Sequence, residues 1–185
     1  MSYAVTPYLI PEILIPNYMI GGITDEYMEI KLGRLEKFFS QIDQLFESKN
    51  AIKAADAAHE IVKGKITRSD SASGAVYWYA FEKIIHIKDQ ALLLDNNDFS
   101  PISVSALLTL FEKYNVYSPE SGKRLDIPFC QPDDFPLVAL IPHHQAIKLR
   151  EDFSELNLPE TCHQQFIKWL NKAVEEASSL LLYCY

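Results

Sequence analysis

Histidines are the residues of this 185-residue chain best suited to acid–base or metal chemistry, and there are five of them. His143 and His144 are adjacent, so on a helix their side chains diverge by about 100° and do not readily share one ion. Zinc sites favour spacings such as His-x₃-His or Cys-x₂-Cys, and neither spacing occurs in the sequence. We therefore predict neither a metal site nor a cofactor.

Catalysis by a general base is a separate hypothesis. His143 or His144 would act as the base, near Glu151 or Cys130, in a small cytosolic enzyme. The chain contains no GxGxxG or GxxxxGK phosphate loop and no GxSxG nucleophile elbow. His59 and His86 fit ordinary surface or core-edge positions better than catalytic ones. A non-enzymatic protein is the favoured interpretation.

The cysteines and the N-terminal residues indicate a compartment. Cys130, Cys162 and Cys184 are odd in number and widely spaced, which is typical of reduced thiols rather than of a disulfide framework. The opening residues resemble no signal peptide. The apolar residues 8–22 are interrupted by prolines, a glutamate and an asparagine, so they do not form a membrane-spanning helix. We expect a cytoplasmic protein that does not bind membranes.

Charge narrows the class of partner. The chain has 17 basic and 25 acidic residues, a net charge of −8, and its pI is about 5.1. Nucleic-acid binders need a surplus of Lys and Arg, so we predict no nucleic-acid partner. Carboxylates concentrate in two predicted loops between residues 94 and 136: Asp95, Asp98, Glu120, Asp126, Asp133 and Asp134. They suit either a solubilising surface or a patch that attracts a basic partner.

Hydrophobic periodicity predicts the elements that would position these groups. Leu35, Phe38, Phe39, Ile42, Leu45 and Phe46 form one apolar helical stripe. Together with similar patterns it predicts about six helices, at about residues 24–48, 51–62, 75–93, 103–111, 142–153 and 159–178. In the fourth of these, Leu107, Leu108 and Phe111 are expected on the buried side. Residues 115–136, rich in proline, read as a long ordered loop.

Three apolar runs predict strands: residues 3–10, 137–141 and 180–185. An apolar C-terminal run is an aggregation hazard unless it is paired, so we expect it to pair with the strands near Tyr3 and Leu137. The predicted fold class is α+β, predominantly helical, with a small sheet that pairs the N- and C-terminal strands. Length and composition predict a single domain over residues 1–185.

Four short segments carry a family resemblance. They are Ser2-Tyr3 before the first strand, Tyr77 to Glu82 (YWYAFE), Asp134-Phe135-Pro136 before the second strand, and the closing Leu182 to Tyr185 (LYCY). In order and spacing the chain resembles a family of small bacterial proteins of unknown function that is often found beside polymorphic toxin genes. It has Trp78 and Ala139 where that family usually has glycine, so it looks like a divergent member.

The resemblance and the charge together imply a function. An immunity protein, or antitoxin, is soluble, folded before its toxin arrives and complementary to it, and an acidic one can neutralise the toxin by occluding a basic active site. The expected partner is a cognate toxin with a basic cleft, bound one to one. The predicted contacts are the charges of Asp95, Asp98, Asp133 and Asp134, with Phe99 and Phe135 as anchors. The small enzyme and a regulatory binding protein remain the alternatives.

Overall fold

The computed structural model describes residues 4–11, 32–87, 91–95, 104–117, 128–151 and 160–185. The chain divides into two compact units. The sheet unit consists of Met1–Glu12, Ala91–Leu125 and Leu137–Tyr185, and the helical unit consists of Ile13–Gln90 and Asp126–Pro136. The single domain over residues 1–185 stays a prediction.

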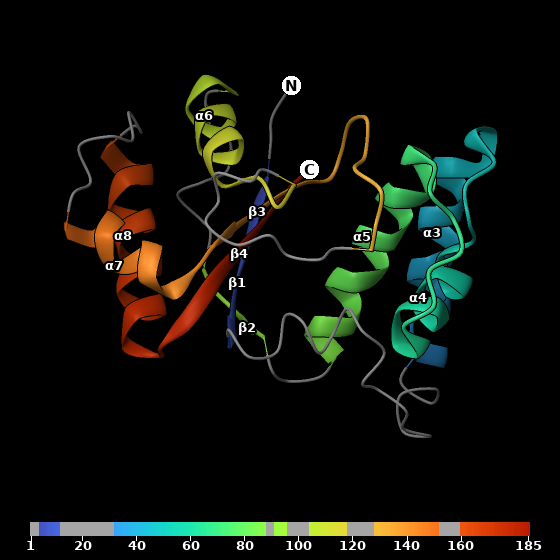
Figure 1. The fold of residues 1–185 in the computed structure, drawn as a ribbon, viewed down its shortest axis with the longest axis horizontal. Coiled ribbons are helices and arrows are strands. Elements are labelled where there is room, and N and C mark those ends of the chain that lie inside the picture. The colour runs from blue at the N-terminus through green and yellow to red at the C-terminus, as the bar shows by residue number, and fades with distance from the viewer. Residues whose placement is uncertain (1–3, 12–31, 88–90, 96–103, 118–127, 152–159) are drawn as a thin grey trace. The chain divides into compact units, whose positions relative to one another are not determined.

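The sheet unit contains a four-stranded antiparallel sheet with strand order β2-β1-β4-β3 (Figure 1). The strands are β1 (Val5–Pro11), β2 (Leu92–Leu93), β3 (Leu137–Ile141) and β4 (Ser178–Cys184). The C-terminal strand β4 lies between β1 and β3 and pairs with both, as the apolar C-terminal run predicts.

Strand β4 has the composition of a strand covered on both faces. All seven of its residues are buried, which explains the continuous apolar run where a half-exposed strand would alternate. Tyr183 packs edge-on against Tyr8 of β1, with 6.1 Å between ring centroids. Pro7 accepts a hydrogen bond from the Leu94 amide, so its missing N–H faces β2. A proline there removes no hydrogen bond between β1 and β4.

Three helices complete the sheet unit: α6 (Val104–Tyr114), α7 (His143–Glu151) and α8 (Glu160–Glu175). The predicted apolar stripe of α8 is buried at Phe166, Trp169 and Leu170. On α6 the prediction for Leu108 is wrong, because its side chain is 39% exposed. Leu110 is buried beside Phe111 instead, so the helix is rotated relative to the predicted face.

The helical unit contains α3 (Glu36–Phe46), a short 3₁₀ turn η1 (Glu47–Lys49), α4 (Ala54–Lys63) and α5 (Ser71–Ile87) (Figure 1). Helix α4 ends at Gly64, which adopts the left-handed conformation with φ 64°. The Gly64 amide donates to the Ile61 carbonyl at 3.0 Å, and the Lys65 amide donates to that of Glu60 at 2.9 Å. This is the predicted glycine C-cap.

Helix α5 is shifted relative to the prediction at both ends. It begins at Ser71, four residues early, because Asp70 caps it by accepting hydrogen bonds from the Ser73 amide at 2.9 Å and the Ser73 hydroxyl at 2.8 Å. It ends at Ile87, and Leu92–Leu93 form β2 by pairing with Tyr8 and Leu9. Pairing in the sheet thus overrides the helical pattern that continues to Leu93.

The predicted fold class is confirmed. The described residues contain six α-helices and a small antiparallel sheet that includes both the N-terminal and the C-terminal strand. Residues 24–31 of the first predicted helix and residue 103 of the fourth lie outside the described residues. No helix in the described ranges is long and apolar enough to cross a membrane.

Candidate functional site: an acidic segment on helix α5

Residues 128–136 of the helical unit lie against helix α5 and are here called the acidic segment. Phe129 is buried and stacks on Tyr77 with 5.4 Å between ring centroids. Its ring also meets Trp78 at 5.2 Å and Phe81 at 5.9 Å, both edge-on. Contacts among aromatic rings stabilise beyond the area they bury, so Phe129 fixes the start of the segment on the helix.

Backbone contact fixes the next residue. A Cβ atom added at Gly74 would stand 2.1 Å from the carbonyl oxygen of Cys130, a separation that real Cβ atoms do not show. Glycine within a helix costs about 1 kcal/mol relative to alanine. The close approach to Cys130 explains why glycine is present in the first turn of α5 despite that cost.

The two carboxylates of the segment, Asp133 and Asp134, are exposed, and Asp133 lies at the start of α5. Asp133 accepts a hydrogen bond from the Ser71 hydroxyl at 2.5 Å, which places its charge at the positive end of the helix dipole. Asp134 is exposed and acts on Tyr79. Burial raises the pKa of the Tyr79 hydroxyl, and the negative charges of Glu82 and Asp134 raise it further. Phe135 is half-buried.

Three of the six predicted contact residues belong to the acidic segment. Asp133, Asp134 and Phe135 are consecutive in the acidic segment. Asp95 belongs to the sheet unit, where its side chain is exposed and its backbone carbonyl accepts a hydrogen bond from the Trp169 indole at 2.6 Å. Asp98 and Phe99 lie outside the described residues. A binding role for all six stays a prediction.

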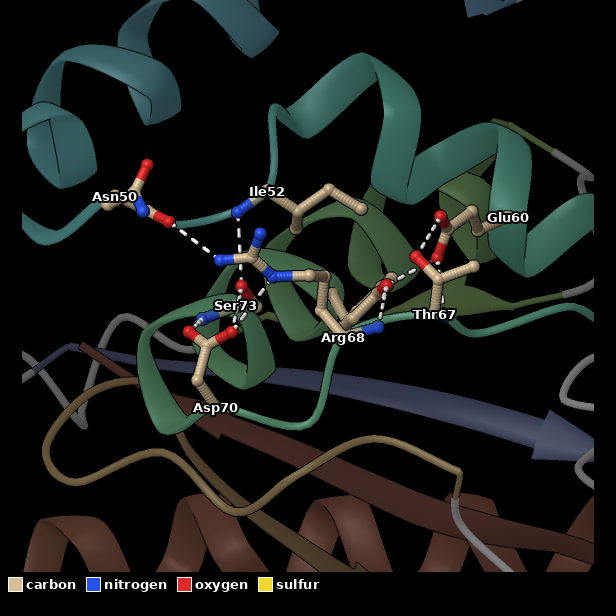
Figure 2. Close-up of polar contacts among 8 residues, drawn as sticks. Asn50, Ile52, Glu60, Thr67, Arg68, Asp70 and Ser73 are labelled. Atoms are coloured by element: carbon tan, nitrogen blue, oxygen red, sulfur yellow. Dashed lines mark hydrogen bonds and ion pairs between the residues drawn. The ribbon is translucent and has the colours of Figure 1, made fainter.

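A polar network joins the loop before α5 to helix α4 (Figure 2). Glu60 is its centre: one carboxylate oxygen accepts from the Thr67 hydroxyl at 2.6 Å, and the other accepts from the Thr67 amide at 2.9 Å and from the Tyr77 hydroxyl. Burial opposes ionisation of Glu60, but the hydrogen bonds from Thr67 and Tyr77 outweigh it and hold its pKa below the ordinary value.

The second half of the network surrounds Arg68. Its guanidinium donates to the Asn50 carbonyl at 2.9 Å and to the Asp70 carboxylate at 3.1 Å, as Figure 2 shows. The Ser73 hydroxyl accepts from the Ile52 amide at 3.0 Å while it donates to Asp70. Burial opposes ionisation of Asp70, but hydrogen bonds from Ser73 and Arg68 lower its pKa overall. The network fixes the start of α5, and therefore the site at which Asp133 is held.

Sequence reasoning missed Glu60, Arg68 and Tyr77 as positioning residues. The contacts that join them span up to 18 residues of sequence, and no local pattern encodes such pairs. Asp70 with Ser73 three residues later is the one local signal, since an Asp at that spacing suits an N-cap.

On α7, all of whose residues are described, neither His143 nor His144 lies beside Glu151, and a catalytic role for either histidine stays a prediction. His143 is half-buried and His144 is exposed in the first turn, while Glu151 is the last residue. At 1.5 Å per residue, Glu151 lies about 10–12 Å along the helix from both, beyond hydrogen-bond reach. Among the described residues, no three His, Cys, Asp or Glu side chains are grouped so that they could hold a metal ion.

The fold and the site define an α+β protein that presents two exposed carboxylates on a segment packed against an aromatic helix. A family model matches residues 1–185, and its description is a domain of unknown function (DUF7691). The chain belongs to this family, which confirms the expected membership of a family of unknown function. No curated protein and no solved structure shows a significant match to the chain.

Proposed function

We propose that this protein is a bacterial immunity protein of the cytoplasm, which binds a cognate toxin and occludes its active site. The acidic segment is the contact that we assign to it, with Asp133 and Asp134 as the charges and Phe135 as the anchor. The observation that carries the proposal is the exposure of both carboxylates on a segment whose backbone is fixed by Phe129 and Gly74.

The acidic segment is held in one conformation, and this favours tight binding to a toxin. A segment already packed in one conformation loses little conformational entropy on binding, and this raises affinity without new contacts. The aromatic packing of Phe129 and the hydrogen bond from Ser71 to Asp133 both reduce the freedom of the segment. An immunity protein needs this property because it must bind before the toxin reaches its substrate.

Electrostatics favours a basic cleft as the target. The net charge of −8 attracts a positively charged partner over about a Debye length, which raises the association rate. The acidic excess is shared by both units, so net charge alone does not locate the contact. Asp133 and Asp134 are adjacent and exposed, and two such carboxylates match the Lys and Arg side chains that line clefts for nucleic acids or nucleotides.

Co-expression tests the proposal. The product of the neighbouring gene is tested as the candidate toxin, and cell growth is measured with the wild-type protein, with Asp133→Asn/Asp134→Asn and with Glu36→Gln/Glu47→Gln. The second double variant removes the same charge from exposed positions of the helical unit. Growth is expected with the wild type and the control and lost with Asp133→Asn/Asp134→Asn. Full toxicity in the presence of soluble wild-type protein would contradict the proposal.

A further inference from the structure

One flank of helix α3 exposes a large apolar side chain. The sequence pattern places Leu45 on the same buried face as Phe39 and Ile42, but its side chain is 67% exposed. Phe39 and Ile42 are buried as predicted. Leu45 lies seven residues after Phe38, so the two side chains share a line along the helix.

Two aromatic side chains of α3 lie against residues of α5: the Phe38 ring against Lys83 and the Phe46 ring against Tyr79. The Phe46 and Tyr79 rings lie 6.1 Å apart, and both are half-buried, as is Phe38. We call the surface formed by Phe38, Leu45, Phe46 and Tyr79 the α3–α5 aromatic face. Scattered single apolar residues are normal on a surface, whereas a contiguous group of this kind is typical of a binding site.

The carboxylates of α3 and η1 lie away from this face. Glu36, Asp43 and Glu47 follow a spacing of seven and four residues, which places them on one common flank. Asp43 marks the direction of that flank, since it accepts a hydrogen bond from the Ala54 amide of α4 at 2.8 Å. The neighbours of Leu45 by helical spacing include the exposed, uncharged Gln41 and Ser48 and the exposed Lys49, and none of them is acidic.

Two lysines border the aromatic face. The Lys83 ammonium lies 4.6 Å from the centroid of the Phe38 ring, and that of Lys49 lies 5.6 Å from the centroid of the Phe46 ring. Lys83 also pairs with the buried Glu82 at 3.1 Å, which uses one of its three N–H donors. Glu82 balances part of the Lys83 charge, so the exposed Lys49 is the main positive charge that we assign to this rim.

We propose that the α3–α5 aromatic face binds an acidic amphipathic helix of a partner protein. Its apolar side chains cover Leu45 and the neighbouring rings, and its carboxylates reach Lys49 and Lys83. The negative charge of Asp134, in the acidic segment, acts on the Tyr79 hydroxyl. It repels carboxylates of the partner from the part of the face near Tyr79, so these carboxylates are expected to contact the two lysines instead. This surface differs from the acidic segment, and the proposal does not depend on the immunity function.

Two synthetic helical peptides test the proposal. They share one Leu- and Phe-containing face and carry either Glu or Lys at every flanking position. Each is titrated into the ¹⁵N-labelled full-length protein, and amide shifts are mapped. The Glu peptide is expected to shift the amides of Gln41, Leu45, Phe46 and Tyr79. Leu45→Gln is expected to weaken its binding about tenfold, because the burial of one leucine side chain is lost. Leu108→Gln, at an exposed leucine of α6, is expected to leave binding unchanged.

Comparison of the Glu and Lys peptides distinguishes specific binding at the aromatic face from general electrostatic attraction. Net charge alone favours the Lys peptide, so binding of the Glu peptide to the aromatic face would support the proposal against that general attraction. Binding of the Lys peptide to this face, no shift there with either peptide, or equal weakening by Leu45→Gln and Leu108→Gln would each overturn it. Shifts that the Lys peptide causes at Asp133 and Asp134 belong to the acidic segment and test the immunity proposal separately.

Discussion

The α-carbon of Gly74 faces the carbonyl of Cys130 so closely that a methyl group at position 74 would overlap it, with 2.1 Å between Cβ and oxygen. This contact joins the first turn of α5 to a segment more than fifty residues later in the chain. It allows the acidic segment to lie flat on the helix, with Phe129 on the aromatic rings and Asp133 at Ser71.

Replacing Gly74 tests this contact. Gly74→Ala is expected to lower the free energy of unfolding by about 1–3 kcal/mol, because backbone atoms must move to admit the methyl group. Gly33→Ala is the matched control, since nothing lies within 4 Å of a Cβ atom there and alanine is the better helix former. Urea denaturation measures both variants. Equal stability of Gly74→Ala and the wild type would contradict the assigned role.

Acid should weaken the network at Glu60. Its folded-state pKa is lowered below 4.5, so the folded state binds fewer protons than the unfolded state. The stabilisation is present above about pH 4.5 and is lost as the pH falls through the folded pKa. Glu60→Gln is expected to be less stable at pH 7 and to show a smaller loss of stability between pH 5 and pH 3. Urea midpoints across this range measure the effect, and exposed Glu47→Gln is the control. An unchanged acid dependence in Glu60→Gln would count against the network.

Ala177, two residues after the end of helix α8, adopts the left-handed conformation with φ 46°. A side chain raises the energy of this conformation by about 1–2 kcal/mol, whereas glycine adopts it freely. Ala177→Gly is expected to raise the free energy of unfolding by about 0.5–1 kcal/mol, after allowance for the greater freedom of glycine in the unfolded chain. Asn50→Gly at φ 50° serves as the comparison, because asparagine tolerates this region and little change is expected. Thermal denaturation measures the melting temperatures of both variants and of the wild type. A lower melting temperature for Ala177→Gly than for the wild type would refute the prediction.

The three free cysteines should differ in reactivity. Cys162 and Cys184 are buried, and burial raises the pKa of the Cys184 thiol to about 11, so it stays protonated at neutral pH. Cys130 is half-buried. A thiol reagent is expected to modify one cysteine rapidly in the native protein and all three in denaturant, and Cys130→Ser should abolish the rapid phase. Rapid native modification of Cys184 would contradict its burial.

The sequence predicted most of the sheet because its signals are local or nearly so. The apolar run at residues 180–185 predicted a strand that is paired on both edges. The other strong strand patterns in the sequence were those near Tyr3 and Leu137, so they were its expected neighbours. The start of α5 was missed because Ser71 and Gly74 are weak helix formers by themselves. Their helical conformation depends on the Asp70 cap and on the contact with Cys130.

The candidate site was predicted in part for a related reason. Asp133 and Asp134 stand out because they are adjacent and follow a proline-rich loop. Phe129 belongs to the same predicted loop, yet it is buried against Tyr77. The packing of residues 128–136 against α5 depends on contacts between distant segments, which hydrophobic periodicity does not encode.

Affinity for the cognate toxin is the most direct test of the acidic segment. Calorimetry would compare the wild-type protein with Asp133→Asn/Asp134→Asn and Glu36→Gln/Glu47→Gln, at low and at physiological salt. We expect the first double variant to bind at least about tenfold more weakly and with a smaller salt dependence, while the second retains wild-type affinity. Equal affinities for all three proteins would contradict the account.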